Sequence, residues 1–183
     1  FAEGVDASGS QDALIEANVL TSTGRDAISG VDSQWIAAQR LRAINNAITN
    51  SGLIRTNGSV TSLPGASFGA IRSGHDSMVT GNSIDGSGYV GIITMSNGNV
   101  SGNGVSNACL ILDDCAGIYV NSSGAGTTVS GNIVSSVPGN RDGRPGTATH
   151  TVGIYLDDLA NAVTVLNNTT TGADHGIQLH NAY

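Results

Sequence analysis

Three segments of the chain repeat a pattern in which two chemically capable side chains lie two positions apart. The pairs are Tyr119 with Asn121, Tyr155 with Asp157, and Gln178 with His180. Aromatic rings stack on sugar rings, while amides, carboxylates and imidazoles bond hydroxyl groups or move protons. This combination is what a saccharide site requires. We therefore expect the two tyrosines, the asparagine and the glutamine to bind substrate.

Asp157 is the expected acid, base or nucleophile, with His180 or His175 as its proton partner. A glycoside hydrolase needs two carboxyl groups, ~5 to 5.5 Å apart for retention or ~6.5 to 9.5 Å apart for inversion. The second carboxyl group could come from Asp158, Asp142 or Asp174. Adjacent strand residues point to opposite faces unless the chain bends, so a neighbouring segment or loop is a better source than Asp158.

A lyase or epimerase makes different demands on the same residues. It needs a base beside a uronate carboxylate and a cation that neutralises the carboxylate. The candidates for these roles are His175, His180, Tyr155 and Arg144. The acidic balance of the chain repels a polyuronate unless calcium intervenes.

The longest insertion, residues 137–150, comes directly before the segment that carries Asp157. Insertions in repeat proteins tend to mark the binding face. We therefore expect Arg141 and Arg144 to contact substrate, and Asp142 and His150 to help wall a groove.

The elements that position these residues follow from an internal repeat. A glycine followed by alternating apolar residues recurs at 91–94, 117–120, 153–156 and 176–179, and a second phrase ending in asparagine recurs at 79–82, 100–103, 129–132 and 165–168. Each phrase has the alternation of a strand that is too short to be stable alone. Stacked copies would bury the second and fourth positions and place the third and fifth on one outer face, with coils ~4.8 Å apart.

Asparagine tolerates the left-handed backbone conformation and can bond its stacked copy through the side-chain amide, so its column suits a solenoid corner. These phrases resemble the right-handed parallel β-helix repeat family of the pectate-lyase-like superfamily. The resemblance covers nearly the whole chain and implies one all-β solenoid domain over 1–183, of about six to seven coils. The family includes polysaccharide lyases, glycoside hydrolases, uronan epimerases, phage tailspikes and non-enzymatic surface proteins, so the fold alone does not fix an activity.

Composition narrows the partners. The seven basic residues are all arginine against fourteen Asp and Glu, which gives a net charge of −7. Nucleic acid is disfavoured because phosphate binding needs a basic stripe, and no apolar run is long enough to span a membrane. Cys109 and Cys115 can form the disulfide of an exported protein, or remain two buried thiols. We expect an extracellular or cell-surface location and a polysaccharide partner.

Two local features are less regular. Residues 32–42 combine a helix N-cap with good helix formers and predict a short helix. Asp113 and Asp114 could bind calcium with Asp85 or Asp76, although ordinary solvated carboxylates are favoured because a calcium cage takes six to eight oxygens. We expect that the protein requires no cofactor.

The alternative function is a non-catalytic scaffold, such as an adhesin, tailspike or filament subunit. The last glycine phrase, at 176–179, belongs to a coil that the sequence leaves unfinished. Exposed strand edges invite pairing, so the chain is expected to be a segment of a longer solenoid or to associate end to end.

Overall fold

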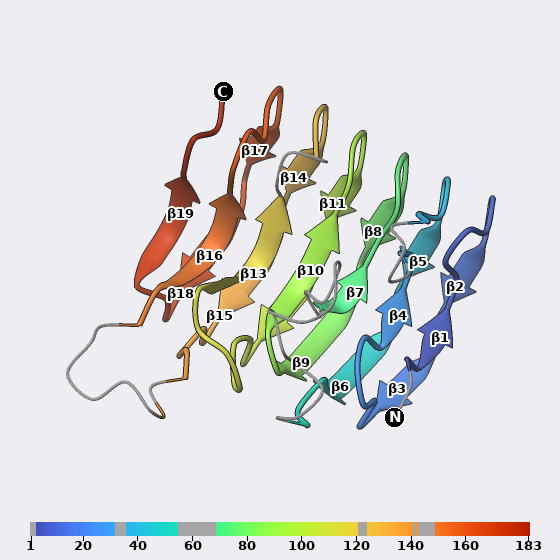
Figure 1. Cartoon of the computed structure of the whole chain (residues 1–183), viewed down its shortest axis with the longest axis horizontal. Helices are drawn as coiled ribbons and strands as arrows, with labels where there is room; N and C mark the ends of the chain where they lie inside the picture. Colours follow the sequence, from blue (N-terminus) through green and yellow to red (C-terminus); the bar gives the residue numbers. More distant parts are fainter. Residues whose placement is uncertain (1–2, 32–35, 55–68, 121–123, 141, 143–148) are drawn as a thin grey trace.

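The computed structural model describes residues 3–31, 36–54, 69–120, 124–140, 142 and 149–183 (Figure 1). All its strand pairs are parallel, and each strand pairs with the third one before and after it in the sequence. Each coil therefore contributes one strand to each of three sheets. This arrangement is a parallel β-helix of about six to seven coils, as the repeat predicts.

The first sheet has seven strands in sequence order, and they lie side by side along the long axis of the molecule in Figure 1. They are β1 (Val5–Asp6), β4 (Ile28–Ser29), β7 (Gly69–Arg72), β10 (Val90–Thr94), β13 (Cys115–Val120), β16 (Thr151–Leu156) and β19 (His175–Leu179). The glycine phrases predicted from the sequence fall in β10, β13, β16 and β19.

The second and third sheets have six strands each. The second holds β2 (Leu14–Glu16), β5 (Arg42–Ile44), β8 (Met78–Thr80), β11 (Asn99–Ser101), β14 (Thr128–Ser130) and β17 (Thr164–Leu166). The third holds β3 (Val19–Thr21), β6 (Ala47–Ser51), β9 (Ser83–Ser87), β12 (Gly104–Ser106), β15 (Ile133–Ser135) and β18 (Thr169–Thr171).

The core consists of columns of small and β-branched apolar side chains. A three-residue strand can direct only its middle side chain inward, so exact register is needed to make a continuous core. In the first sheet one column runs through Val5, Ile28, Ile71, Ile92, Ile118, Ile154 and Ile177. From Ile28 to Ile154 these side chains are fully buried.

A ladder of asparagines joins the second sheet to the third. The side-chain oxygen of Asn132 accepts hydrogen bonds from the backbone N–H and the side-chain amide of Asn103, both at 2.9 Å. The same exchange links Asn18, Asn46, Asn82, Asn103, Asn132 and Asn168. The predicted asparagine column is therefore present.

The backbone of this corner differs from the expectation in one respect. The left-handed residue is the one before each ladder asparagine, such as Asn45 with φ 52° or Gly102 with φ 63°. The turn is made one position earlier, because the ladder asparagine must keep its N–H directed along the stack toward the next oxygen.

The expected helix at 32–42 is not formed in residues 36–42, and residues 32–35 lie outside the described residues. Gln39 pairs in parallel with Gln11 on one side and His75 on the other, and β5 begins at Arg42. Pairing within the stack therefore overrides the local helix propensity. Among the described residues, no helix is long and apolar enough to cross a membrane.

Candidate functional site

The C-terminal ends of β13, β16 and β19 bring the paired residues of the sequence repeat together. Tyr119 is in register with Tyr155, and Tyr155 with Gln178, because their neighbours at the inward position stack in the core. The two tyrosine rings meet edge to face, with centroids 5.6 Å apart. Tyr155 is only 4% exposed, so its ring supports the surrounding side chains more than it offers a face to solvent.

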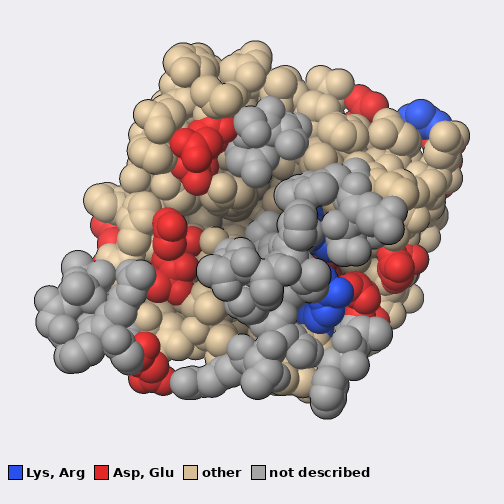
Figure 2. All heavy atoms as spheres, viewed as in Figure 1, with Lys and Arg blue, Asp and Glu red and all other residues tan. Residues whose placement is uncertain are grey.

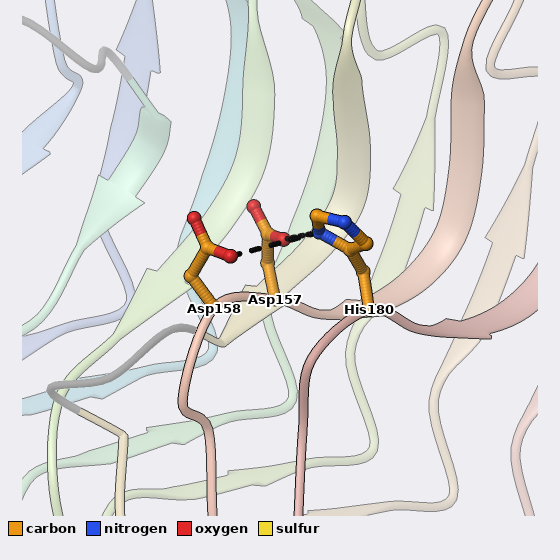
Figure 3. Close-up of side chains that lie close together, drawn as sticks. All are labelled: Asp157, Asp158 and His180. Atoms are coloured by element: carbon orange, nitrogen blue, oxygen red, sulfur yellow. Dashed lines mark hydrogen bonds and ion pairs between the residues drawn. The ribbon is translucent and has the colours of Figure 1, made fainter.

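Asp157 and His180 form the centre of this site (Figure 3). His180 Nδ1 lies 2.7 Å from Asp157 Oδ1, and the Tyr119 hydroxyl donates to Asp157 Oδ2 at 2.8 Å. The Asp157 side chain is 16% exposed, whereas that of His180 is 51% exposed. Both oxygens of the carboxylate are thus engaged, while the imidazole reaches solvent.

The electrostatics of Asp157 define its chemical state. Burial by itself would raise the pKa of this carboxyl group, but hydrogen bonds from His180 and Tyr119 outweigh it and lower the pKa. Burial and the contact with Asp157 raise the pKa of the Tyr119 hydroxyl. Near neutral pH the site therefore holds a carboxylate and a protonated phenol, so Asp157 is suited to orient and stabilise a neighbouring imidazole.

Asp158 also turns toward His180, with its Oδ1 3.7 Å from His180 Nδ1. The sequence argument placed adjacent aspartates on opposite faces unless the chain bends. The chain does bend here, because β16 ends at Leu156 and a turn follows. Asp157, Asp158 and His180 each offer an atom within 4.8 Å of the others, and this mixed set of oxygen and nitrogen ligands can hold a divalent cation.

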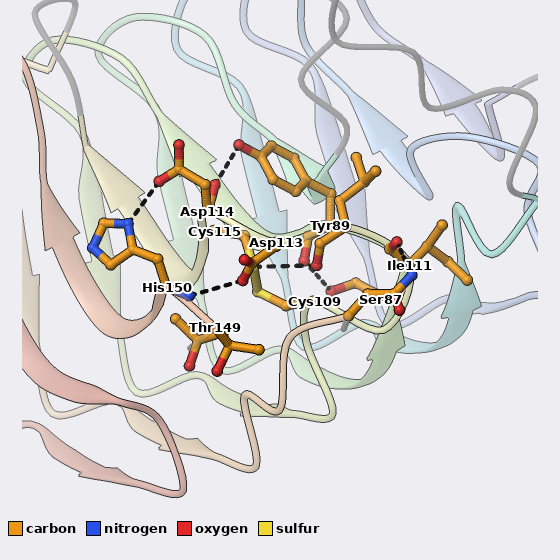
Figure 4. The surroundings of a disulfide bond; sticks show 12 residues. Ser87, Tyr89, Cys109, Ile111, Asp113, Asp114, Cys115, Thr149 and His150 are labelled. Carbon is orange, nitrogen blue, oxygen red and sulfur yellow. Dashed lines mark hydrogen bonds and ion pairs between the residues drawn. A yellow bond between two sulfur atoms is a disulfide. The ribbon is translucent and has the colours of Figure 1, made fainter. Parts of the chain in front are cut away.

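His150 makes more contacts than the sequence analysis predicts (Figure 4). Its Nδ1 lies 2.9 Å from Asp114 Oδ1, its Nε2 lies 2.9 Å from Gln178 Oε1, and its ring packs against Tyr155 with centroids 5.6 Å apart. Burial opposes the charged form, but the bonds to Gln178 and Asp114 outweigh it and raise the pKa of His150.

The signal for this contact was present in the repeat. Aligning the glycine phrases of β13 and β16 pairs Cys115 with Thr151, which places Asp114 beside His150. The same alignment could have been extended one residue outward from the strands. The backbone N–H of His150 also donates to Asp113 Oδ1 at 2.9 Å, so both acidic residues hold the start of β16.

The remaining candidates occupy several places. His175 lies against His150, with ring centroids 6.0 Å apart, and His180 is the histidine that contacts Asp157. Asp174 accepts a hydrogen bond from the Thr149 hydroxyl at 2.7 Å. Asn121, Arg141 and Arg144 lie outside the described residues.

Cys109 and Cys115 form a disulfide whose sulfurs are 2.04 Å apart. It closes the segment that carries Asp113 and Asp114. The proposed calcium partners of these two residues do not join them, because Asp85 bonds Ser106 and Asn107 and Asp76 bonds Asn97.

The charged residues that the structure describes are unevenly distributed along the chain. Every arginine among the described residues comes from the first 72 positions, whereas aspartates surround the site (Figure 2).

Three parallel sheets stacked coil upon coil define a parallel β-helix protein. The chain belongs to the right-handed β-helix region family, whose model matches residues 2–169. Comparisons with curated proteins and with solved structures gave no match.

Proposed function

We propose that this protein is an extracellular carbohydrate-active β-helix protein that acts on a polysaccharide lying across the outer ends of β13, β16 and β19. The observation that carries the proposal is the contact of Asp157 with His180 and Tyr119. It gives a solvent-facing imidazole a fixed orientation beside aromatic and amide groups.

His180 is the expected proton carrier. A histidine whose Nδ1 is held by a carboxylate presents its Nε2 in a defined tautomer to a reacting group. Asn181 Nδ2 lies 3.4 Å from this Nε2, a distance long enough for a substrate hydroxyl or water to replace the contact. Asp157 then acts as a positioning residue, because both of its oxygens already accept hydrogen bonds.

Tyr119 and Gln178 would bind the sugar. Tyr119 is partly exposed, and its hydroxyl is fixed by Asp157, so its ring edge has a single orientation. Gln178 is held by His150 through its oxygen, which leaves its amide N–H groups for a sugar hydroxyl. The disulfide supports an extracellular location, where such bonds persist.

The test is a panel of neutral, amino-bearing and uronate polysaccharides, assayed for new reducing ends and for the ultraviolet absorbance of unsaturated uronate ends. We expect His180→Gln and Asp157→Asn each to lower turnover about 10²-fold or more, the loss typical of a removed proton-transfer group. Matched controls are His75→Gln and Asp85→Asn, because these side chains bond to Ser96 and to Ser106 away from the site. Full activity in both site variants, or neither binding nor turnover with any polysaccharide, would contradict the proposal.

A second candidate is a scaffold that associates end to end. It is favoured by apolar side chains on the edge strand β19, where Ile177 is 48% and Leu179 65% exposed. Strand edges of this kind pair readily with another chain. Light scattering that rises with concentration in wild type and falls in Leu179→Lys would support this candidate, whereas a monomer at all concentrations would exclude it.

A further inference from the structure

A chain of hydrogen bonds joins three side chains from consecutive coils beside the proposed site. Asp114 precedes β13, His150 precedes β16, and Gln178 lies in β19. His150 Nδ1 lies 2.9 Å from Asp114 Oδ1 (Figure 4), and His150 Nε2 lies 2.9 Å from Gln178 Oε1. The histidine therefore links a carboxylate on one side to the amide of Gln178 on the other.

The ring of His150 is held in one orientation. Its centroid lies 5.6 Å from that of Tyr155 and 6.0 Å from that of His175, and the backbone N–H of His150 donates to Asp113 Oδ1. Because the ring is fixed, the gain or loss of a proton must be answered by its hydrogen-bond partners. Among the described residues, the titratable groups that face or flank the ring are Asp113, Asp114, Tyr155, Asp174 and His175.

The two ring contacts determine which nitrogen atoms carry protons. A carboxylate and an amide oxygen only accept hydrogen bonds, so both nitrogens of His150 donate, as they do in the charged imidazolium. Burial opposes the charged form, but the bonds to Gln178 and Asp114 outweigh it and raise the pKa of His150. In this state Gln178 turns its oxygen toward the ring and its N–H groups away from it.

Loss of one proton reverses the contact with Gln178. Nδ1 of His150 keeps its hydrogen, because the carboxylate of Asp114 can only accept. Nε2 then becomes an acceptor and can no longer pair with the oxygen of Gln178. A half-turn of the terminal amide restores the bond, because the amide nitrogen then donates to Nε2. The amide oxygen of Gln178 takes the place that its N–H groups held.

We infer that His150 is a specificity-determining residue that sets which hydrogen-bonding groups Gln178 presents to a bound sugar. With the ring charged, Gln178 presents N–H donors, which suit groups that only accept, such as the carboxylate or ester of a uronate. With the ring neutral, Gln178 presents an oxygen, which suits hydroxyl and amide N–H groups. The inference rests on the proposed function, because it assigns a preference to the same site.

The first test needs no ligand. Nitrogen NMR of the full, isotope-labelled chain from about pH 5.5 to about pH 8.5 spans the ordinary histidine range and reports the protons of His150 and the amide of Gln178. We expect the amide signals of Gln178 to follow the titration of His150, and the neutral ring to carry its proton on Nδ1. This response should be lost in His150→Gln and should persist in the control His75→Gln, which removes a histidine bonded to Ser96.

Either of two NMR results would overturn the inference while the proposed function stands. One is a neutral His150 ring that carries its proton on Nε2. The other is an amide of Gln178 whose signals do not follow the titration of His150.

The second test measures recognition with uncharged probes, so that the charge of the ring does not itself attract the ligand. The probes are fully methyl-esterified oligogalacturonate, whose ester groups only accept, and the same oligomer with each ester reduced to a hydroxymethyl group, which also donates. The ratio of the ester affinity to the alcohol affinity, measured by calorimetry, should fall about two- to tenfold between about pH 5.5 and about pH 8, as expected for one hydrogen bond.

Gln178→Met keeps the length of the side chain but removes the amide, so its affinity ratio should not change with pH. A wild-type ratio that is independent of pH, or binding of neither oligomer, would overturn the role of His150 in sugar recognition. Binding of neither oligomer together with a negative polysaccharide panel would remove the proposed function as well.

Discussion

His180 and Asp157 are 23 positions apart in the sequence, yet Nδ1 of the first lies 2.7 Å from Oδ1 of the second. The contact arises because β16 and β19 are neighbours with Leu156 in register with Leu179. One coil of the solenoid thus places the residue after each strand beside its counterpart. Any pair of chemical groups at these positions becomes a pair in space.

The Asp157 and His180 contact predicts a specific response to acid. Because the pKa of Asp157 is lowered in the folded state, its contribution to stability is present above the unfolded value of about 3.9 and is lost as pH falls through the folded pKa. We expect Asp157→Asn to show less loss of stability than wild type when pH falls below about 4. Urea unfolding at a series of acidic pH values measures this, and identical acid profiles for the two proteins would refute it.

The raised pKa of His150 predicts a contribution to stability that decreases, rather than increases, as pH rises. Its pKa is raised in the folded state, so its stabilising contribution is complete below the unfolded value of about 6.5 and is lost as pH rises through the folded pKa. The difference in melting temperature between wild type and His150→Gln should be largest in mildly acidic buffer and should decrease above neutral pH. A difference that stays constant, or grows with pH, would mean that the contacts with Asp114 and Gln178 do not favour the charged ring.

Much of this arrangement could be predicted from the sequence, because the glycine phrases are short and can be aligned with one another directly. Aligning the glycine phrases fixes the register, so it placed Tyr119 beside Tyr155 and Asp157 beside His180. The contact of Asp114 with His150 lies three residues before the aligned glycine phrases and one residue before the strands β13 and β16. It could have been found by extending the alignment, but a strand pattern alone does not say that pairing continues there.

Other features could not be predicted from local pattern. The segment before β5 contains good helix formers, but Gln39 pairs with the coils on both sides, and such pairing depends on residues far away in the sequence. The turn of Asp158 toward His180 depends on where β16 ends. The contact of Asn140 with the backbone oxygen of Ile111 joins two segments that meet only after the coils have stacked.

Substitution of a ladder asparagine should destabilise the fold most in the middle of the ladder. Asn103 is 1% exposed, and its amide donates to Val79 O and Asn132 Oδ1 while its oxygen serves Asn82. Asn103→Ala removes these bonds and leaves the N–H of Asn82 buried without an acceptor, so we expect a loss of about 2–3 kcal/mol in the free energy of unfolding. Asn168→Ala, at a partly exposed position of the ladder, should cost less. Urea denaturation of both variants tests the order, and an equal or reversed order would contradict it.

In the buried ion pair of the N-terminal coils, removing one partner should cost more stability than replacing both. Asp26 and Arg72 are 0% and 3% exposed, with the guanidinium Nε 3.1 Å from the carboxylate. Burial raises the pKa of Asp26 to about 6 although Arg72 opposes the rise, which shows how strongly desolvation weighs at this position. Asp26→Ala should cost about 3–5 kcal/mol because it leaves a buried charge, whereas the double variant Asp26→Leu with Arg72→Met should recover most of that loss. A double variant as unstable as the single one, measured by chemical denaturation, would indicate that the pair is held by other contacts.

The disulfide should stabilise the coil that carries it. Cys109 and Cys115 are six positions apart, and closing so short a loop stabilises a fold by about 2 kcal/mol in the chain-entropy model. Replacing both cysteines by alanine should lower the free energy of unfolding by about that amount. Urea denaturation of the folded double variant, compared with wild type, measures this loss. An unchanged free energy of unfolding would contradict the prediction.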